Sequence, residues 1–492
     1  MKARIGILLL LLAAWLKLTA AERPPNILLI VADDTGYGDL SAHGHPILRT
    51  PQLDRLHRES VRFTDFHVSP TCAPTRSALL TGRHEFKNGV THTILERERL
   101  APSAVTLAEG LRKAGYTTGI FGKWHLGDEP RYQPNRRGFD EVFIHGGGGI
   151  GQTYPGSCGD APGNRYFDPA ILHNGRFEKT RGFCTDIFTT QAISWMGTVK
   201  QRSRRPFFCY VPFNAAHAPL SCTAEYRAPY LGLVPDQTAT LFGMIANIDA
   251  NVGRMLDQLG AWGIDRETLV IYLNDNGGDG VSARVFNAGM RGSKNTPWLG
   301  GTRATGFWRW PGRFQPREVA ALTAHIDFFP TLIELAGGKL DARARAQIEG
   351  RSLVPLLRNT PVEWPERTLF THIGRWPKGT NVNLFKYSGC SVRSGPWHLV
   401  SDGNERQPRA KGWQLFQVFD DPGERTDVSS NHPDVVARLD TEYDHWWADV
   451  VPRMVNERAQ GPEINPFKAL YWRQFGGGPP AGKPSPRSRV RP

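Results

Sequence analysis

The sequence predicts an α/β fold in which helices flank a mainly parallel sheet, followed by a smaller α+β subdomain. Three observations predict this fold. Short, continuous apolar runs, typical of strands buried on both faces, recur along the first half of the chain. Segments with helical periodicity separate these runs. Beyond residue 369 the pattern changes to short strands bounded by turn residues.

The first part of the chain alternates predicted strands and helices. The run NILLIVA at residues 26–32 has no polar interruption after its first position, so we expect a strand buried on both faces. A helix is predicted at 51–60, then a strand at 61–68, then a helix that begins near Cys72. The remaining predicted elements are helices at 105–114 and 238–259 and strands at 116–121, 206–211 and 268–273.

Residues 129–188 interrupt this alternation. The region is rich in Gly, Arg and Pro and holds four consecutive glycines at 146–149. Its lack of periodicity predicts loops. These loops either line the substrate side or form a solvated surface insertion.

A smaller α+β subdomain is predicted at 369–452, after a main α/β domain at 22–368. The turn sequence DDPG lies at 420–423. The chain ends at 453–492 in a basic, Pro/Gly-rich stretch, which predicts a disordered tail. The predicted elements of the subdomain are strands at 390–393, 397–400 and 414–419 and a helix at 432–447.

Residues 1–21 have the pattern of a signal peptide. Lys2 and Arg4 precede an apolar run at 5–16, and small residues near position 20 suit cleavage. The run is too short to span a bilayer comfortably, and no later segment approaches that length. We therefore expect an exported protein, periplasmic or secreted, without stable membrane insertion; an uncleaved membrane anchor is the alternative.

The formal net charge of +13 is concentrated at the two ends of the chain. Residues 1–21 carry +3 and residues 453–492 carry +6, so the body carries only +4. This distribution argues against nucleic acid as a partner, although a mildly positive body suits a polyanionic substrate. The share of hydrophobic residues, 40%, with 22% charged, is that of a globular protein and excludes fibrous and disordered classes.

Six cysteines in an exported protein suggest disulfide bonds. If Cys72 is a catalytic residue and forms no disulfide, at most two disulfides form among the other five cysteines. Proximity in the sequence suggests the pairs Cys158–Cys184 and Cys209–Cys222, although partners cannot be read from sequence.

The stretch SPTCAPTRSALLTGR, residues 69–83, holds a cysteine in a C-x-P-x-R frame at the start of a predicted helix. Pro74 suits the first helical turn, and Gly82 ends the helix. Cys72 would then lie where the backbone N–H groups and the helix dipole favour an anion. Arg76 adds a fork of donors suited to a tetrahedral oxyanion. The alternative is a buried structural thiol in a capping loop.

Polar side chains follow four of the predicted strands, at the point where each strand ends. In open α/β sheets the carboxyl ends of the strands form the ligand crevice. We therefore expect these side chains to meet at one site: Asp33, Asp34, Lys123, His125, His217, Asp275 and Asn276.

The oxygen donors in this set indicate a hard divalent cation. Asp33, Asp34, Asp275 and Asn276 suit Ca²⁺, with Mg²⁺ as the alternative. Singly, each of these motifs is more often a turn than a ligand set. The sequence has neither H-E-x-x-H nor C-x-x-C, so zinc has little support.

An ordered series of segments resembles the motifs of the sulfatase family. The resemblance covers roughly residues 24–450 and implies an alkaline-phosphatase-like fold, a bound Ca²⁺ and hydrolysis of sulfate esters. It also implies that a formylglycine-generating enzyme oxidises Cys72 to formylglycine, whose hydrate is the nucleophile. The segments are NILLIVADDTGYG (26–38), TPQLDRLHRESVRFTD (50–65), 72–83, GYTTGIFGKWHLG (115–127), PFNAAHAP (212–219), LNDNGG (273–278), 291–312, 392–400 and 416–428.

The resemblance also implies a role for each candidate residue. Asp33, Asp34, Asp275 and Asn276 would bind the metal, with the modified Cys72 beside them as a further ligand. Arg76 would orient the hydrated aldehyde, and Lys123 and Lys294 would hold the sulfate. His217 would protonate the departing alcohol, and His125 would take a proton from the second hydroxyl of the hydrate.

The sequence departs from the family pattern at three places. Thr75 stands where the signature most often has Ser, and Leu299 replaces a usual acidic residue. Around residues 145–151 no additional sulfate-proximal polar residue can be placed.

Two other functions compete with hydrolysis of sulfated carbohydrate, for which aryl sulfates would be model substrates. The first is hydrolysis of phosphate or phosphonate esters on the same fold. The second is an inactive protein that binds sulfated glycans, although the intact set of Cys72, Arg76, Lys123, His125, His217 and Lys294 speaks against it.

Overall fold

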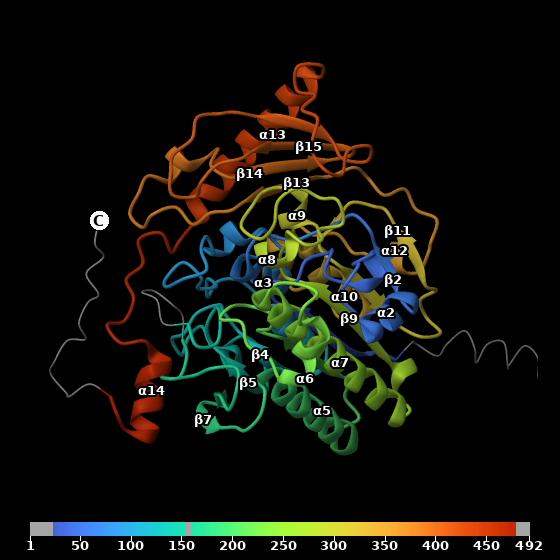
Figure 1. Cartoon of the computed structure of the whole chain (residues 1–492), viewed down its shortest axis with the longest axis vertical. Helices are drawn as coiled ribbons and strands as arrows, with labels where there is room; N and C mark the ends of the chain where they lie inside the picture. Colours follow the sequence, from blue (N-terminus) through green and yellow to red (C-terminus); the bar gives the residue numbers. More distant parts are fainter. Residues whose placement is uncertain (1–22, 153–158, 479–492) are drawn as a thin grey trace, which may run out of the picture.

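A ten-stranded sheet forms the centre of the computed structural model, which describes residues 23–152 and 159–478 (Figure 1). The strand order is β11-β2-β10-β9-β1-β8-β4-β5-β6-β7. In chain order these strands are β1 (Asn26–Ala32), β2 (Val61–Phe63), β4 (Thr117–Lys123), β5 (Glu141–His145), β6 (Ala170–His173), β7 (Arg176–Lys179), β8 (Phe207–Pro212), β9 (Thr268–Asn274), β10 (Gly306–Arg309) and β11 (Arg317–Val319).

The five central strands, β9-β1-β8-β4-β5, all run parallel. Antiparallel pairs occur toward the edges, where β10 pairs with β9 and β2, and β6 pairs with β5 and β7. The carboxyl ends of the central strands therefore lie at one edge of the sheet. The predicted α/β fold with a mainly parallel sheet is confirmed.

Two layers of helices cover the two faces of this sheet. Alternate side chains of β1 point to opposite faces, so Ile27 and Leu29 join one core and Leu28 and Ile30 the other. The first core holds α3 (Cys72–Thr81), α4 (Leu107–Lys113) and α10 (Phe328–Leu335), and the second holds α2 (Pro51–Arg58), α5 (Cys184–Arg202) and α7 (Asp236–Ala261). Shorter helices are α6 (Ala224–Arg227), α8 (Gly280–Ala283), α9 (Leu299–Thr302), α11 (Ala342–Gln347) and α12 (Val354–Leu357).

A second, antiparallel sheet lies at the top of Figure 1 and carries one long helix. Its inward side chains, among them Val392 and Leu399, pack with Tyr443 and Trp447 of the helix. The predicted α+β subdomain is confirmed. Its elements are β13 (Thr368–His372), β14 (Cys390–Ser394), β15 (Trp397–Ser401), β16 (Gln414–Gln417) and α13 (Pro433–Val450).

Most described residues of 129–188 lie outside helices and strands, as predicted, but the region also adds three short strands, β5, β6 and β7, to the main sheet. These strands have four or five residues each, too few for a clear periodic pattern. The hairpin between β6 and β7 turns at Asn174 and Gly175, which both have positive φ, 46° and 88°. Asn-Gly is a strong hairpin signal, so this turn could have been predicted.

The predicted disorder of residues 453–492 is wrong for α14 (Pro466–Phe475). Asn465 caps this helix by accepting hydrogen bonds from the backbone N–H groups of Phe467 and Lys468. Phe467 is buried against Phe177. The Gln474 side chain hydrogen-bonds to the backbone N–H and carbonyl groups of Phe177. The helix therefore extends the core at the β7 edge of the sheet, despite the basic composition around it.

Two further predictions need correction. The strand expected at 61–68 is divided into β2 and the short β3 (Phe66–His67), which pairs with β12 (Thr323–Ala324). The suggested Cys209–Cys222 disulfide is wrong, since both thiols are free. The Cys184 thiol is also free and donates a hydrogen bond to Asn214 Oδ1 at 3.0 Å. The predicted signal peptide and Cys158 lie outside the described residues.

Candidate active site

The candidate site lies where the central strands end, and the sheet alone brings most of its residues together. Asp33 and Asp34 follow β1, and Asp275 and Asn276 follow β9, the strand that pairs with β1 on one side. Lys123 is the last residue of β4, and His217 follows β8. All of these side chains, with Cys72, Arg76, His125 and Lys294, belong to one connected cluster.

Cys72 is the first residue of α3, as predicted, and Gly82 ends this helix with φ of 69°. Its thiol is buried, and burial raises the pKa of that thiol. The Cys72 sulfur, an Asp33 carboxylate oxygen and a His217 ring nitrogen all lie within 4.8 Å of one another. The cysteine therefore lies at a helix N-terminus and beside the carboxylates.

Three carboxylates, from Asp33, Asp34 and Asp275, have oxygens within 4.8 Å of one another, and all three residues are buried. Burial and the neighbouring Asp275 raise the pKa of Asp33 well above its ordinary value, although Lys123 opposes the shift. Such a group of buried negative charges is stable only with cations beside it.

The oxygens of this cluster fit a divalent cation. Within the described residues, Asp33 Oδ1 and Asn276 Oδ1 are buried and have no hydrogen-bond partner. Buried oxygens without partners are rare in proteins and need an explanation, such as a bound ion. Carboxylate and amide oxygens are the ligands of Ca²⁺ and Mg²⁺.

Arg76 has a different geometry from the one the sequence suggested. Its Nε and Nη2 donate to Asp275 Oδ2 at 3.0 and 2.7 Å, and Nη1 donates to the Lys123 carbonyl oxygen at 3.3 Å. The guanidinium is fully buried. It therefore binds the end of β9 to the end of β4 and holds one Asp275 oxygen in place.

The two lysines each pair with one of the aspartates that follow β1. Lys123 Nζ contacts Asp33 Oδ2, and Lys294 Nζ contacts Asp34 Oδ2 at 2.5 Å. Lys294 reaches this position from the loop after α8, and its backbone N–H donates to the Gly278 carbonyl at 3.1 Å. Burial raises the pKa of Asp34, but Lys294 and His217 outweigh it, so this carboxylate stays charged.

The two histidines are held in defined orientations by backbone carbonyl groups. His125 Nε2 donates to the Thr93 carbonyl at 2.8 Å, which leaves Nδ1 with a free lone pair and no partner among the described residues. His217 Nδ1 donates to the Ala218 carbonyl at 2.7 Å, and its Nε2 lies 3.6 Å from Asp34 Oδ2. Burial, with Lys294 nearby, lowers the pKa of His217 to about 3.

Residues 25–338 match the family model for Sulfatase, which is well over half of the chain. The chain belongs to the sulfatase family. It is 30% identical over 492 aligned residues to arylsulfatase J of Mus musculus, covering 91% of this chain and 79% of the relative. It is 33% identical to N-acetylgalactosamine-6-sulfatase of Mus musculus, covering 86% of this chain and 85% of the relative.

A solved structure has the same fold over almost the whole chain. The crystal structure of Ps i-CgsB in complex with k-i-k-neocarrahexaose superimposes with a TM-score of 0.75 and 25% identity. The match covers 92% of this chain and 97% of that one. The family model and the named relatives identify the protein as a sulfuric ester hydrolase of the alkaline phosphatase superfamily.

The sulfatase has a cavity of about 250 Å³ over Cys72, and several of its lining residues were not predicted. Lys294, His125 and His217 line it together with Cys72, as the sequence indicated. Gln152 follows the glycine-rich stretch in which no polar residue could be placed, and Asn295 directly follows Lys294. No local signal in the sequence points to the others. The unpredicted lining residues are Thr93, Gly148, Gln152, Asn295 and Arg375.

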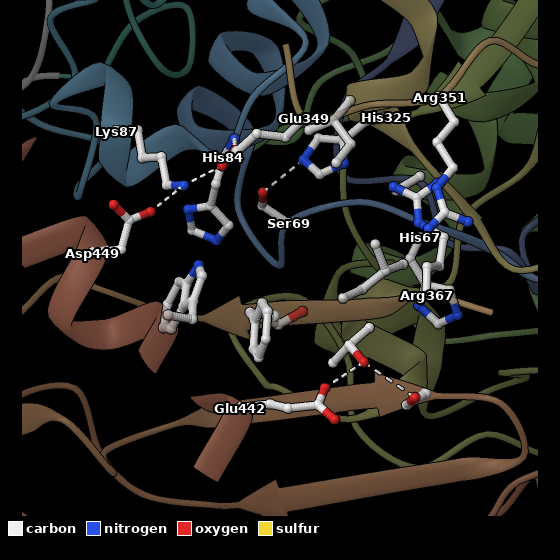
Figure 2. A pocket seen from close by; sticks show the side chains of 18 of the residues that line it. His67, Ser69, His84, Lys87, His325, Glu349, Arg351, Arg367, Glu442 and Asp449 are labelled. Atoms are coloured by element: carbon white, nitrogen blue, oxygen red, sulfur yellow. Dashed lines mark hydrogen bonds and ion pairs between the residues drawn. The ribbon is translucent and has the colours of Figure 1, made fainter. Parts of the chain in front are cut away.

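A larger cavity of the sulfatase, about 770 Å³, lies between the main sheet domain and the C-terminal subdomain, away from this cluster (Figure 2). None of the predicted site residues lines it. Its charged groups are mostly paired with one another: Lys87 contacts Glu349 and Asp449, and Arg438 contacts Glu442. The larger cavity therefore holds none of the residues of the candidate site.

Glu85, beside that cavity, should make the stability of the sulfatase depend on pH. It is fully buried, accepts a hydrogen bond from Ser69 Oγ at 2.7 Å, and burial raises its pKa from 4.5 to about 7. A raised carboxyl pKa stabilises the fold below pH 4.5, and this stabilisation is lost as the pH rises through 7. Between pH 4.5 and 8 the wild type should lose about 3 kcal/mol relative to Glu85→Gln.

Urea unfolding at several pH values measures this difference. The exposed Glu225→Gln variant is the control, and its difference from wild type should not change with pH. A constant difference between wild type and Glu85→Gln over the same range would contradict the prediction.

Proposed function

We propose that the protein hydrolyses sulfate monoesters of sulfated carbohydrate through a formylglycine hydrate derived from Cys72, beside a bound Ca²⁺. One observation carries this proposal. The Cys72 side chain lies at the N-terminus of α3, beside three buried carboxylates, in a cavity that also exposes Lys294, His125 and His217. Such a set of groups suits an anionic substrate that needs charge neutralisation and proton transfer.

Asp33, Asp34, Asp275 and Asn276 would hold the cation, with the modified residue 72 beside them; Mg²⁺ is the alternative ion. The unpartnered oxygens of Asp33 and Asn276 support this ligand set. When bound, the ion supplies positive charge that withdraws electrons from the sulfate oxygens. Arg76 keeps Asp275 in position through its two hydrogen bonds.

Formylglycine hydrate, when present, would supply one hydroxyl as the nucleophile and a second hydroxyl whose deprotonation re-forms the aldehyde and expels sulfate, so that water need not attack a crowded sulfate. The other residues bind the substrate and move protons. The N-terminus of α3 favours the sulfate charge, and Lys123 and Lys294 bind its oxygens. His125, whose Nδ1 lone pair is free, accepts the proton of the second hydroxyl.

His217 would protonate the departing alcohol through Nε2, since its Nδ1 is committed to the Ala218 carbonyl. Asp34, 3.6 Å from Nε2, favours the protonated form that this role needs. Burial and Lys294 oppose it in the protein without substrate. The negative charge of a bound sulfate ester would shift the balance toward protonation.

Sulfated carbohydrate is the substrate class that the relatives favour, because one of them is an N-acetylgalactosamine-6-sulfatase. Aryl sulfates serve as model substrates. The protein would need a formylglycine-generating enzyme as a partner to modify Cys72. We place it outside the cytoplasm, periplasmic or secreted, on the basis of the signal peptide at 1–21. Within residues 23–152 and 159–478, no helix is apolar and long enough to cross a membrane.

Initial rates on nitrophenyl sulfate, nitrophenyl phosphate and a nitrophenyl phosphonate ester test the proposal against its rival on the same fold. We expect kcat/KM to be highest for the sulfate. A strong preference for phosphate or phosphonate would favour the rival hydrolase. Binding of sulfated glycans without hydrolysis of any ester would favour the non-catalytic alternative.

A further inference from the structure

One positively charged residue of the C-terminal subdomain reaches the cavity over Cys72. Arg375 lies in the loop after β13 and lines the cavity beside Lys294 and Asn295. The other charged and titratable residues that line this cavity come from the main domain. The subdomain therefore contributes a cation to a site that the large sheet otherwise builds.

The backbone around Arg375 is fixed in an unusual conformation. Arg375 has φ of 65°, which L-residues other than glycine rarely adopt. Its N–H donates to the Thr91 carbonyl of the main domain at 2.9 Å. Gly374 also has positive φ, and a Cβ there would lie 2.3 Å from the same carbonyl oxygen. Residues in strained conformations that the surrounding structure holds in place are concentrated at binding sites.

The guanidinium of Arg375 has no carboxylate partner. Its Nη1 donates to Asn295 Oδ1 at 2.5 Å, and its buried Nε has no partner among the described residues. Among the described residues, no carboxylate oxygen lies within 4.0 Å of the guanidinium nitrogens of Arg375. Two buried arginines, by contrast, are paired: Arg76 with Asp275 and Arg97 with Glu457. Arg375 therefore presents an uncompensated charge and free donors in a fixed position.

Asn295 keeps this guanidinium beside the sulfate-binding lysine. Its backbone N–H donates to the Pro70 carbonyl at 3.0 Å, which fixes it to the loop before Cys72. Lys294, its neighbour, contacts Asp34. Lys294 and Arg375 therefore both line the cavity, linked through Asn295. A carboxylate of the protein balances the charge of Lys294 but not that of Arg375.

We infer that Arg375 binds a second anionic group of the substrate, a sulfate ester or a carboxylate, distinct from the sulfate that is removed. This inference rests on the function proposed above and narrows its substrate class to saccharides with at least two anionic groups. The cavity of about 250 Å³ is smaller than the roughly 300–1,000 Å³ of sites that enclose a whole small ligand. Arg375, only partly buried, can therefore meet a group next to the scissile sulfate.

Matched saccharide pairs test this inference. Each pair shares one scissile sulfate, and only one member carries a second anion: N-acetylgalactosamine 6-sulfate with its 4,6-disulfate, and N-acetylglucosamine 6-sulfate with glucosamine N,6-disulfate. Sulfate release gives kcat and KM for each. The wild type should prefer the doubly charged member at least tenfold in kcat/KM, mainly through KM, because a charge-assisted contact binds ground state and transition state alike.

Two variants and a control isolate the contribution of Arg375. Arg375→Ala should remove the preference, and Arg375→Lys should keep part of it, since lysine retains the charge and loses the fork. Arg406→Ala, in an exposed position of the same subdomain, should keep the wild-type preference. Thermal unfolding confirms that each variant folds, and Arg375→Lys serves as the test if the alanine variant does not.

The outcomes separate this inference from the function on which it rests. Equal loss of activity on both members of a pair, or a wild type without preference in any pair, overturns the assignment of Arg375. If the protein hydrolyses nitrophenyl sulfate but none of the saccharides, the assignment of Arg375 is also wrong, but the protein is still a sulfatase. Failure on nitrophenyl sulfate as well means that the proposed function itself is wrong.

Discussion

Replacing Cys72 by alanine is expected to lower kcat on nitrophenyl sulfate by about 10⁴-fold or more. Removal of the nucleophile of a hydrolase has an effect of this size, because the remaining groups bind the substrate without providing a reaction path. The side chain removed is small and lies in the first turn of α3. The fold should therefore tolerate the change.

Cys209→Ala is the matched control for this experiment. Cys209 is also buried and free, but it lies within β8, away from the site cavity. That variant should lose some stability through the small cavity it creates and should keep its kcat. Comparable activity of Cys72→Ala and wild type would contradict the role of residue 72.

Adding Ca²⁺ to chelator-treated protein is expected to raise its melting temperature. An ion that binds only the folded state stabilises it by about 2.7 kcal/mol at one hundred times its dissociation constant. The effect should be large because three buried carboxylates repel one another without the ion. Differential scanning calorimetry over a series of Ca²⁺ concentrations measures the shift.

Asn276→Ala tests whether this stabilisation comes from the predicted ligands. Asn276 Oδ1 is one of the two unpartnered oxygens of the carboxylate cluster, and its removal breaks no ion pair. The Ca²⁺ concentration that gives half of the thermal shift should rise about tenfold or more. Asn247→Ala, a buried asparagine of α7 that contacts Asp186, should respond as wild type does. An unchanged Ca²⁺ response in Asn276→Ala would place the ion elsewhere.

The central sheet could be predicted because its strands are long and buried on both faces. Strands such as β1 and β9 appear in the sequence as unbroken apolar runs, and a parallel sheet needs such runs. Once the strands are located, the residues at their carboxyl ends are located as well. This is why Asp33, Asp34 and Asp275 could be grouped without coordinates.

The edges of the fold gave weaker signals. β6 and β7 have four residues each and are stabilised by one another across a turn. Helix α14 lies in a basic stretch, where composition indicated disorder, and it is ordered because Phe467 enters the core. For β6 and β7 the Asn174-Gly175 turn is the local signal, whereas α14 is ordered by tertiary contacts that cannot be read from a single sequence.

The site itself shows the same limit. Lys294 and His217 could be proposed because they lie in motifs, whereas Arg375 lies in a loop of another subdomain with no motif around it. Arg76 could be located, but not its geometry, since its contact with Asp275 depends on how α3 meets β9. Pairings between distant segments are the part of the site that only the folded structure supplies.

Mass spectrometry of the tryptic peptide that spans residues 63–76 tests the central claim most directly. The protein should be made together with a formylglycine-generating enzyme and shown to be active before digestion. We expect a peptide in which the thiol-bearing carbon of Cys72 has become an aldehyde. An intact thiol at residue 72 throughout a fully active preparation would contradict the proposed mechanism.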